Sequence, residues 1–462
     1  MKNIKSMIAV AVLGITSTAT GQNLNSGYFN DGYLYRHELN PAYGNTQNYI
    51  AFPGFGNVNF GLNSNLKISD VLYNVDGRTA LFLNPKVDAN EFLSNINKKN
   101  RIGENLKLQV VGAGFKAWGG YNTVEINARQ DLYLNIPGSL FELTKRGIEN
   151  KVYDLGNLHA HGDAYAEIAF GHSRQFDDKL RLGAKFKVLL GIANFNAHVD
   201  KARLELRDDA YVGTTSASIQ TSLNSLQYET KSSMRGPEGE QTEHHYVSGI
   251  EDSSFGIAGM GIAFDFGAEY KFNDQLKASI ALLDVGFINW KNCYEASTNG
   301  EHQVNTDRYI FNLDGDQPNS FDNELDRLTE GLADLYELHD NGNVGGNMKA
   351  LSATLNLGVE YTPDFYDKLS FGLLNTTRLA GRYTWTDFRL SANVAPVKCF
   401  SASVTASVGT YGTSFGWLLN AHPTGFNIFL GMDHTLGKLA KQGLPLSGRA
   451  SLSLGINVPF GH

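Results

Sequence analysis

The sequence predicts an all-β protein: an antiparallel transmembrane β-barrel of about 14 strands, with an N-terminal luminal plug and long extracellular loops that carry a short helix. Three observations support this prediction. Apolar residues alternate with small or polar ones in many segments, tight turns alternate with long polar connections, and an export signal precedes them all. A period of two places the apolar side chains on one face of a strand, as in a barrel wall.

The N-terminus predicts export. Lys2 and Lys5 precede a short apolar run at residues 7–15, and small residues follow up to Gly21. A basic stretch, a short apolar stretch and a small-residue site together are typical of a cleaved signal peptide. We place the cleavage after Gly21, so that residues 1–21 are removed. The apolar run is too short to act as a membrane anchor.

The composition excludes several classes of protein. The chain has 462 residues, of which 42% are hydrophobic and 19% charged, and its net charge is −8. A net negative chain argues against a nucleic-acid-binding surface, so we expect no nucleic-acid partner. After residue 21 no stretch approaches the roughly 20 apolar residues of a transmembrane helix, which excludes a helical membrane protein.

The last strand shows the alternation most clearly. Residues 450–460 read ASLSLGINVPF, with every even position apolar, and residues 260–272 and 400–408 repeat the pattern. Soluble sheets also alternate, but these runs exceed the five or six residues usual in soluble strands and match the roughly 9–11 that cross a bilayer. Aromatic residues stand at strand ends, as in an interfacial girdle: Phe176, Phe272, Tyr361, Phe365, Tyr366, Phe400 and Phe460.

The connections divide into two classes. Tight turns at 176–179, 272–275, 362–367 and 395–398 contrast with long polar connections near 196–255 and 291–348. This asymmetry is typical of periplasmic turns and extracellular loops. The strands that follow from it are 49–64, 104–117, 121–136, 157–176, 179–195, 256–272, 275–290, 349–362, 367–377, 382–395, 398–410, 413–421, 424–434 and 447–460.

Three further segments are predicted outside the membrane. Residues 200–222 look strand-like, but a further spanning strand there would put the long 223–255 loop on the periplasmic side, so we assign them to an extracellular hairpin. Leucines at steps of three and four predict an amphipathic helix over 321–338, which we expect to pack on the barrel mouth. A second helix is expected near 88–98.

A short motif near the N-terminus carries a resemblance. Residues 33–45 read YLYRHELNPAYGN and contain Asn40, Pro41 and Ala42. With the signal peptide and the strand count, the chain resembles outer-membrane barrels of Bacteroidota that are related in plan to the long-chain fatty-acid transporter family. The resemblance implies that residues 22–47 form a luminal plug in a barrel of residues 48–462, with the motif residues as plug or ligand candidates. No matching motif carries over that family's ligand-pocket residues.

No catalytic or metal-binding pattern stands out. The glycine pairs in 112–114 and 259–261 lie in strands, where dinucleotide binding does not occur. Residues 312–316 resemble a calcium loop, but Gln317 replaces the required glycine. His159 and His161 share a strand face without further ligands at metal spacing. We therefore expect no enzyme activity, no cofactor and no metal.

Charged residues are predicted to face the lumen. Mixed signs in a narrow interior favour salt bridges that fill it over a selectivity filter. In the hairpin of 157–195, odd positions must pair with odd ones, which places Glu167 opposite Lys187 or one diagonal step away. The predicted luminal charges are Glu125, Arg129, Asp131, Asp163, Glu167, Arg181, Lys185 and Lys187.

The two cysteines are predicted to be free thiols. Cys293 follows an upward strand and Cys399 begins one, so they belong to opposite ends of the barrel. An apolar band about 25 Å tall separates those ends, whereas a disulfide needs Cα atoms within about 7 Å.

Two functions fit the sequence. The first is a barrel that binds or passes a small hydrophobic or amphipathic molecule; the alternative is a non-transporting subunit of an outer-membrane secretion or surface-assembly complex. The partners would be outer-membrane lipid with either that molecule or other outer-membrane proteins. A conducting or ligand-filled lumen favours the first function, and co-purification with other proteins favours the second.

Overall fold

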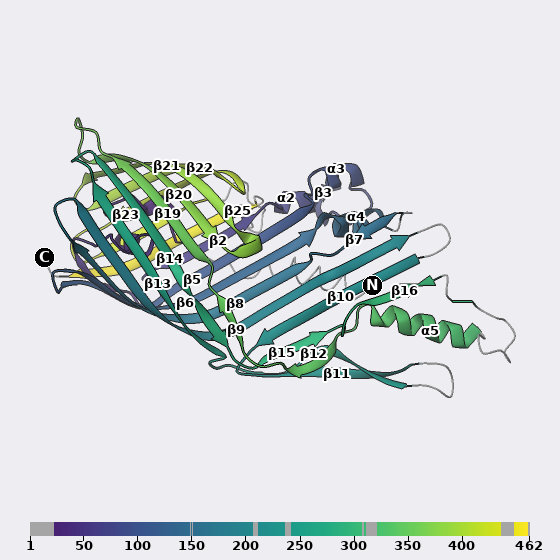
Figure 1. Cartoon of the computed structure of the whole chain (residues 1–462). Coiled ribbons are helices and arrows are strands. Elements are labelled where there is room, and N and C mark those ends of the chain that lie inside the picture. Colours follow the sequence, from purple (N-terminus) through teal and green to yellow (C-terminus); the bar gives the residue numbers. More distant parts are fainter. Residues whose placement is uncertain are drawn as a thin grey trace.

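The computed structural model describes residues 23–147, 149, 151–206, 211–235, 242–306, 309–310, 321–435 and 448–460. The predicted signal peptide and the calcium-loop-like residues 312–317 lie outside these ranges. Within them, the chain forms a closed antiparallel β-barrel whose sheet extends beyond one end (Figure 1).

Fourteen wall positions are counted in the described residues, as predicted. Each wall strand pairs antiparallel with the next, and the last pairs with β1 and β2, so the wall has no free edge. In order they are β1 (Asn48–Ala51) with β2 (Val58–Ser64), β5 (Lys99–Ala117), β6 (Gly120–Pro137), β8 (His159–Gln175), β9 (Leu180–Leu206), β13 (Gly259–Lys271), β14 (Leu276–Trp290), β18 (Asn347–Ala350) with β19 (Ala353–Tyr361), β20 (Leu369–Leu379), β21 (Trp385–Val397), β22 (Phe400–Gly409), β23 (Gly412–Ala421), β24 (Asn427–Met432) and β25 (Arg449–Phe460).

The two faces of the wall follow the sequence alternation. In β25, Ser453 and Asn457 are buried inside the barrel, whereas Val458 and Phe460 are 47% exposed on the outside. In β13, Phe264 likewise points outward. An apolar outer face is what a lipid environment requires, so the transmembrane barrel is confirmed.

One end of the barrel carries tight turns and is called the short-turn end. In the β8–β9 turn, the carboxylate of Asp177 accepts hydrogen bonds from the backbone N–H groups of Lys179 and Leu180, each at 2.7 Å. These bonds hold the pKa of Asp177 below its usual value, because they stabilise the charged form. The opposite end is called the long-loop end.

The long-loop end is less uniform than the sequence predicts. β22 and β23 are joined there by a two-residue turn between Gly409 and Gly412, and β20 leads to β21 through a single 3-10 turn, Gly381–Tyr383. The wall is therefore low on this side and tall on the side of β5 to β9 (Figure 1). β9 alone has 27 residues, against 10 in β22.

The tall side continues beyond the barrel into an extension of the wall, which we call the outer sheet and which consists of the end of β9 with β10 (Tyr211–Ser222), β15 (Cys293–Ser297), β16 (His302–Asn305) and β17 (His339–Asn343). Residues 200–222 pair as a hairpin beyond the wall, as predicted, and the hairpin is continuous with the wall: the end of β9 extends past it and β10 returns beside it. β15 and β16 pair with β10, and β17 pairs with β15. The other described elements beyond the wall are β3 (Leu72–Val75), β4 (Arg78–Leu81), β7 (Val152–Asp154), β11 (Ser225–Arg235) and β12 (Thr242–Ser254).

The predicted helix is present, but its position differs from the expectation. α5 (Phe321–Asp334) packs against β16 and β11 beyond the barrel instead of on the barrel mouth (Figure 1). Just after it, the Leu335 carbonyl accepts a hydrogen bond of 2.7 Å from Thr215, and its side chain lies over Gly213. The outer sheet supplies a surface that the sequence pattern could not reveal.

Three short helices lie near the long-loop end: α2 (Ile68–Val71), α3 (Ala89–Ser94) and α4 (Gly138–Arg146). α3 is the helix expected near 88–98, and Asp88 caps its first turn by accepting the N–H of Glu91. Among the described residues, no helix is long and apolar enough to span a membrane.

Both cysteines are free, as predicted. Cys293 is buried at the start of β15 and its sulfur lies 2.9 Å from Ser222 Oγ. Cys399 is exposed in the tight turn between β21 and β22, at the opposite end of the wall.

The outward face gives a first testable prediction. Phe264→Lys should lower the free energy of unfolding by about 2–4 kcal/mol, because it places a charge on the lipid face near the bilayer midplane. Phe264→Leu should cost less than about 1.5 kcal/mol, since it keeps the position apolar. Urea unfolding of the barrel in lipid vesicles measures both. Equal stability of the two variants would contradict the lipid-facing assignment.

Candidate functional site

The N-terminal segment, residues 23–47, lies inside the barrel. It contains two 3-10 turns, η1 (Asn25–Gly27) and η2 (Leu34–Glu38), and aromatic rings fill the space around them. The ring of Tyr33 lies 5.0 Å from that of Phe429 on β24, and the ring of Tyr35 lies 5.6 Å from that of Tyr49 on β1. Its fully or almost fully buried side chains include Leu24, Tyr28, Phe29, Tyr33, Tyr35, Leu39 and Tyr43.

The wall contacts this segment at glycine residues. A Cβ atom added at Gly372 would lie less than 3.0 Å from the ring of Phe29, and one at Gly431 would lie equally close to Leu24. Such distances are essentially never found, so a larger residue at these positions would force the segment or the wall to shift. We call the six wall glycines with this property the glycine seats: Gly183, Gly267, Gly358, Gly372, Gly416 and Gly431.

The Asn40-Pro41-Ala42 motif occupies two of the seats. Asn40 Oδ1 accepts the N–H of Ala42 at 3.0 Å, which closes a tight turn, and Asn40 Nδ2 donates to the carbonyl of Ala268 at 3.3 Å. The turn lies against Gly183 on β9 and Gly267 on β13. The motif therefore joins the segment to two neighbouring strands, and a direct role in ligand binding stays a prediction.

One ion pair and the contacts of His37 connect the segment to the wall, next to an ion pair between two wall strands. Lys107 Nζ on β5 lies 2.8 Å from Glu38 Oε1, and Lys185 Nζ on β9 lies 2.8 Å from Glu125 Oε2 on β6. His37 Nε2 lies 3.6 Å from Glu125 Oε1 and 3.0 Å from the hydroxyl of Tyr49. Buried charges are tolerated when they are paired, as these are.

A second group of charges lies on the tall side of the lumen. Arg129 donates to Glu167 at 3.0 Å and forks onto both carboxylate oxygens of Asp284, at 3.0 and 3.1 Å. Lys187 Nζ lies 2.7 Å from Asp265 and 2.6 Å from Asp284. Lys187 also lies 3.8 Å from Glu167, one diagonal step away in the register, which confirms the predicted contact.

Sequence reasoning missed the part that Asp265 and Asp284 play here. Asp265 stands on the inward face of β13, but nothing in the alternation marks it as a partner of Lys187. Asp284 lies in a β-bulge between β13 and β14 with φ +58°, a left-handed conformation that Asp adopts more readily than most residues other than glycine. The bulge shifts the register of β14, so simple alternation assigns the wrong face to Asp284.

The remaining predicted luminal charges differ in their partners. Asp131 pairs with Arg378 at 3.2 Å, and Asp163 lies 2.8 Å from His161 Nε2. Among the ion pairs of the described residues none includes Arg181, and its buried Nε has no hydrogen-bond partner. Seven of the eight predicted charges therefore have a charged or ionisable partner, and Arg181 stands apart.

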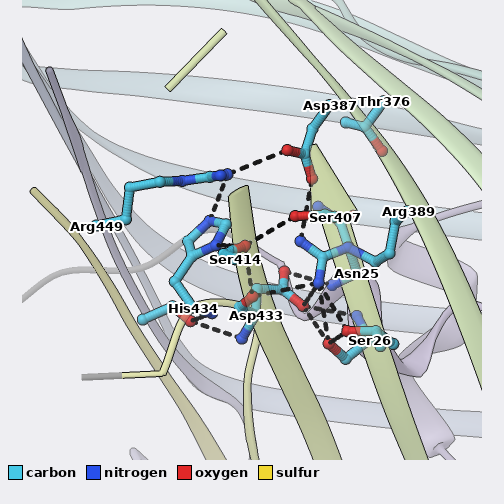
Figure 2. Close-up of polar contacts among 12 residues, drawn as sticks. Asn25, Ser26, Thr376, Asp387, Arg389, Ser407, Ser414, Asp433, His434 and Arg449 are labelled. Carbon is cyan, nitrogen blue, oxygen red and sulfur yellow. Dashed lines mark hydrogen bonds and ion pairs between the residues drawn. The ribbon is translucent and has the colours of Figure 1, made fainter. Parts of the chain in front are cut away.

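The beginning of the segment is held by Asp433, just after β24 (Figure 2). The Asp433 carboxylate accepts the backbone N–H groups of Asn25 at 2.8 Å and Ser26 at 2.6 Å, and also the Ser26 hydroxyl at 2.7 Å. Arg389 Nη1 lies 3.5 Å from Asp433 Oδ1 and donates to Thr405 at 2.9 Å. Residues 408 positions apart thus form one contact.

A serine and a histidine contact each other near Asp433, but the histidine cannot activate the serine as a nucleophile. Figure 2 shows His434 between Ser414 and Arg449. His434 Nδ1 lies 2.8 Å from Ser414 Oγ, and Nε2 lies 3.1 Å from Arg449 Nη2. Because a guanidinium only donates, Nε2 accepts and Nδ1 carries the proton, which leaves no base for the Ser414 hydroxyl.

The described part of the structure has two cavities near the site, one inside the lumen and one on the outer face of the wall. One open pocket of about 430 Å³ lies at the short-turn end of the lumen, and an apolar groove of about 510 Å³ lies on the outer face of β19 to β23. Within the described ranges, no group of three or more His, Cys, Asp or Glu side chains is placed to hold a metal ion.

Comparison with known proteins identifies the family. Residues 41–433 match the family of unknown function DUF5723. The chain belongs to this family. The match begins at Pro41 and ends at Asp433, so it includes the wall and Asp433 but not Asn40 or the residues before it. A search of curated proteins found no match.

Several solved barrels are similar at low identity. A Pseudomonas aeruginosa FadL homologue is 10% identical, with 96% of this chain and 100% of that chain covered and a TM-score of 0.43. The Pseudomonas putida toluene transporter TodX is 11% identical, with 96% of each chain covered and a TM-score of 0.39. The Ralstonia pickettii toluene transporter TbuX is 8% identical, with 96% and 95% covered and a TM-score of 0.39.

The shared lysine of the luminal charge group gives a second prediction. Lys187→Met should lower the free energy of unfolding by about 3–5 kcal/mol, because it leaves buried carboxylates without their cation. Lys201→Met removes an exposed pair with Glu301 at 2.6 Å and should cost less than about 1 kcal/mol. Urea unfolding in vesicles compares them. A cost below 1 kcal/mol for Lys187→Met would contradict the buried ionic group.

Proposed function

We propose that this protein is an outer-membrane β-barrel that binds and passes a small hydrophobic or amphipathic molecule, and that residues 22–47 form the plug that controls passage. The short-turn end then faces the periplasm and the long-loop end faces outward, as is usual for bacterial barrels. The signal peptide predicted at residues 1–21 supplies the export step.

The observation that carries the proposal is how the lumen is filled. A barrel that never opens is most stable when its own inward side chains fill the interior at native density. This wall instead presents six glycine seats to a separate N-terminal segment. We infer from this arrangement that the segment can leave the lumen and return, and that it is not a permanent core.

The plug also indicates the class of ligand. Phe29 lies over Gly372, Leu24 over Gly431 and Pro41 beside Gly267. We infer that the ligand has similar apolar groups, because it would occupy the same positions on the wall once the plug has moved. A molecule with similar apolar groups would bury its surface on the same seats, and nearby polar groups such as Asn356 and Ser403 would orient it.

A second candidate function rests on the outer sheet. Leu325 and Leu332 of α5, and Tyr336 just after it, are 42%, 44% and 66% exposed. Exposed apolar side chains on a helix that already packs on one side fit a protein-binding surface. This observation favours the non-transporting subunit of a secretion or surface-assembly complex, in which the plug would stay in place.

Locking the plug distinguishes the two functions. Ser26 Oγ on the plug lies 3.0 Å from Thr405 Oγ1 on β22, so Ser26→Cys with Thr405→Cys should form a disulfide in a background where Cys293 and Cys399 are serine. We expect oxidation to reduce uptake of the apolar fluorophore N-phenyl-1-naphthylamine by intact cells at least tenfold, and reductant to restore it.

A wall-to-wall disulfide is the matched control. Ser407 Oγ on β22 and Ser414 Oγ on β23 lie 2.7 Å apart and neither belongs to the plug. Ser407→Cys with Ser414→Cys should leave uptake unchanged after oxidation. Equal uptake by the locked and reduced plug variants would exclude transport through the lumen and leave the non-transporting subunit.

A further inference from the structure

Arg181 has hydrogen-bonding capacity that its surroundings do not meet. Its Nε atom is buried and has no hydrogen-bond partner, and none of the ion pairs in the described chain includes it. Ser173 Oγ is also buried without a partner. A buried donor left without a partner costs roughly 1–3 kcal/mol, and more when it is charged.

These two groups lie side by side beneath the end of the plug. A Cβ atom at Gly44 would lie less than 3.0 Å from both Arg181 Nη2 and Ser173 Oγ. Gly44 therefore leaves room for the guanidinium. Glu269 is opposite Arg181 in the β9–β13 register and attracts its guanidinium, but in the described structure the two are not close enough to form an ion pair.

The same guanidinium lines the open pocket of about 430 Å³ at the short-turn end. Lys116 from β5 lines it too, and the Lys116 ammonium has no ion-pair partner among the described residues. The tight turn at Gly119 and Gly120 and the ring of Tyr121 form the rest of the wall. Two cations from different strands thus meet in one polar hollow without a carboxylate lining it.

We propose that this pocket binds a phosphate group, with the Arg181 guanidinium as its main contact and the Lys116 ammonium as the second. A guanidinium presents a fork of donors that matches phosphate oxygens, and the lysine adds a point charge. A phosphate monoester carries about −1.5 to −2 at neutral pH, which balances two cations better than a carboxylate does. The proposal is independent of whether the barrel transports.

Binding to inorganic phosphate tests the site directly. The full-length mature protein in phosphatidylcholine nanodiscs is titrated calorimetrically with sodium phosphate at constant ionic strength. We expect one site per chain, with affinity at least tenfold weaker in Arg181→Gln and several-fold weaker in Lys116→Gln. Lys179→Gln removes an exposed cation two residues from Arg181 and should bind like the wild type.

Two further arms identify the source of the phosphate. If the group belongs to a lipid, wild-type protein in nanodiscs containing phosphatidic acid retains that lipid in native mass spectrometry and Arg181→Gln does not. If it belongs to a soluble molecule, inorganic phosphate binds and phosphatidic acid is not retained. Either result supports the site.

Three results would overturn it. Wild-type protein that binds neither probe excludes the site, and so does Arg181→Gln that binds as tightly as the wild type. Glu269→Gln should bind phosphate at least as well, because it removes a nearby negative charge. If Glu269→Gln weakens binding as much as Arg181→Gln, the effect is structural. Lys116 is exposed, so Lys116→Gln should fold normally. If Arg181→Gln fails to fold, Lys116→Gln still tests the site, and phosphate affinity equal to that of the wild type would contradict it.

Discussion

Closure of the wall into 14 strands is the constraint on which the rest of the structure depends. A barrel of about eight strands has an interior that its own side chains can fill, whereas a wider one encloses more space than they reach. Pairing of β25 with β1 and β2 therefore creates a lumen that requires a filler. Residues 23–47 supply apolar rings, and buried inward charges of the wall fill much of the remaining space.

The filler explains why the lumen combines glycines with buried ion pairs. Where the segment contacts the wall closely, a side chain on the wall would collide with it, as at Gly183 and Gly372. Where the segment is absent, on the tall side, long charged side chains bridge the space and must be paired because they are out of water. Lys187 has three carboxylates within 4 Å and Arg129 has two, so each cation is shared.

Much of this could be predicted from the sequence because a period of two is a local signal. It gave the face of Phe264, the count of wall strands and the closeness of Glu167 to Lys187, since a hairpin register restricts neighbours. It could not give the position of α5 or the contact of Asp433 with Ser26, which depend on segments far apart in the chain. A bulge also defeats alternation, as Asp284 shows.

The way the segment is fixed determines how it can move. At residue 47 it continues into β1, which is paired on both sides, so this end stays with the wall. The other end, at Asn25 and Ser26, is held by hydrogen bonds to the Asp433 carboxylate and by contacts of the Ser26 hydroxyl with Thr405 and Arg389. If the segment leaves the lumen as we propose, its contacts with Asp433, Thr405 and Arg389 must break, whereas the end beside Arg181 would stay with the wall. An anion bound at Arg181 would then stay with the wall while the plug moves.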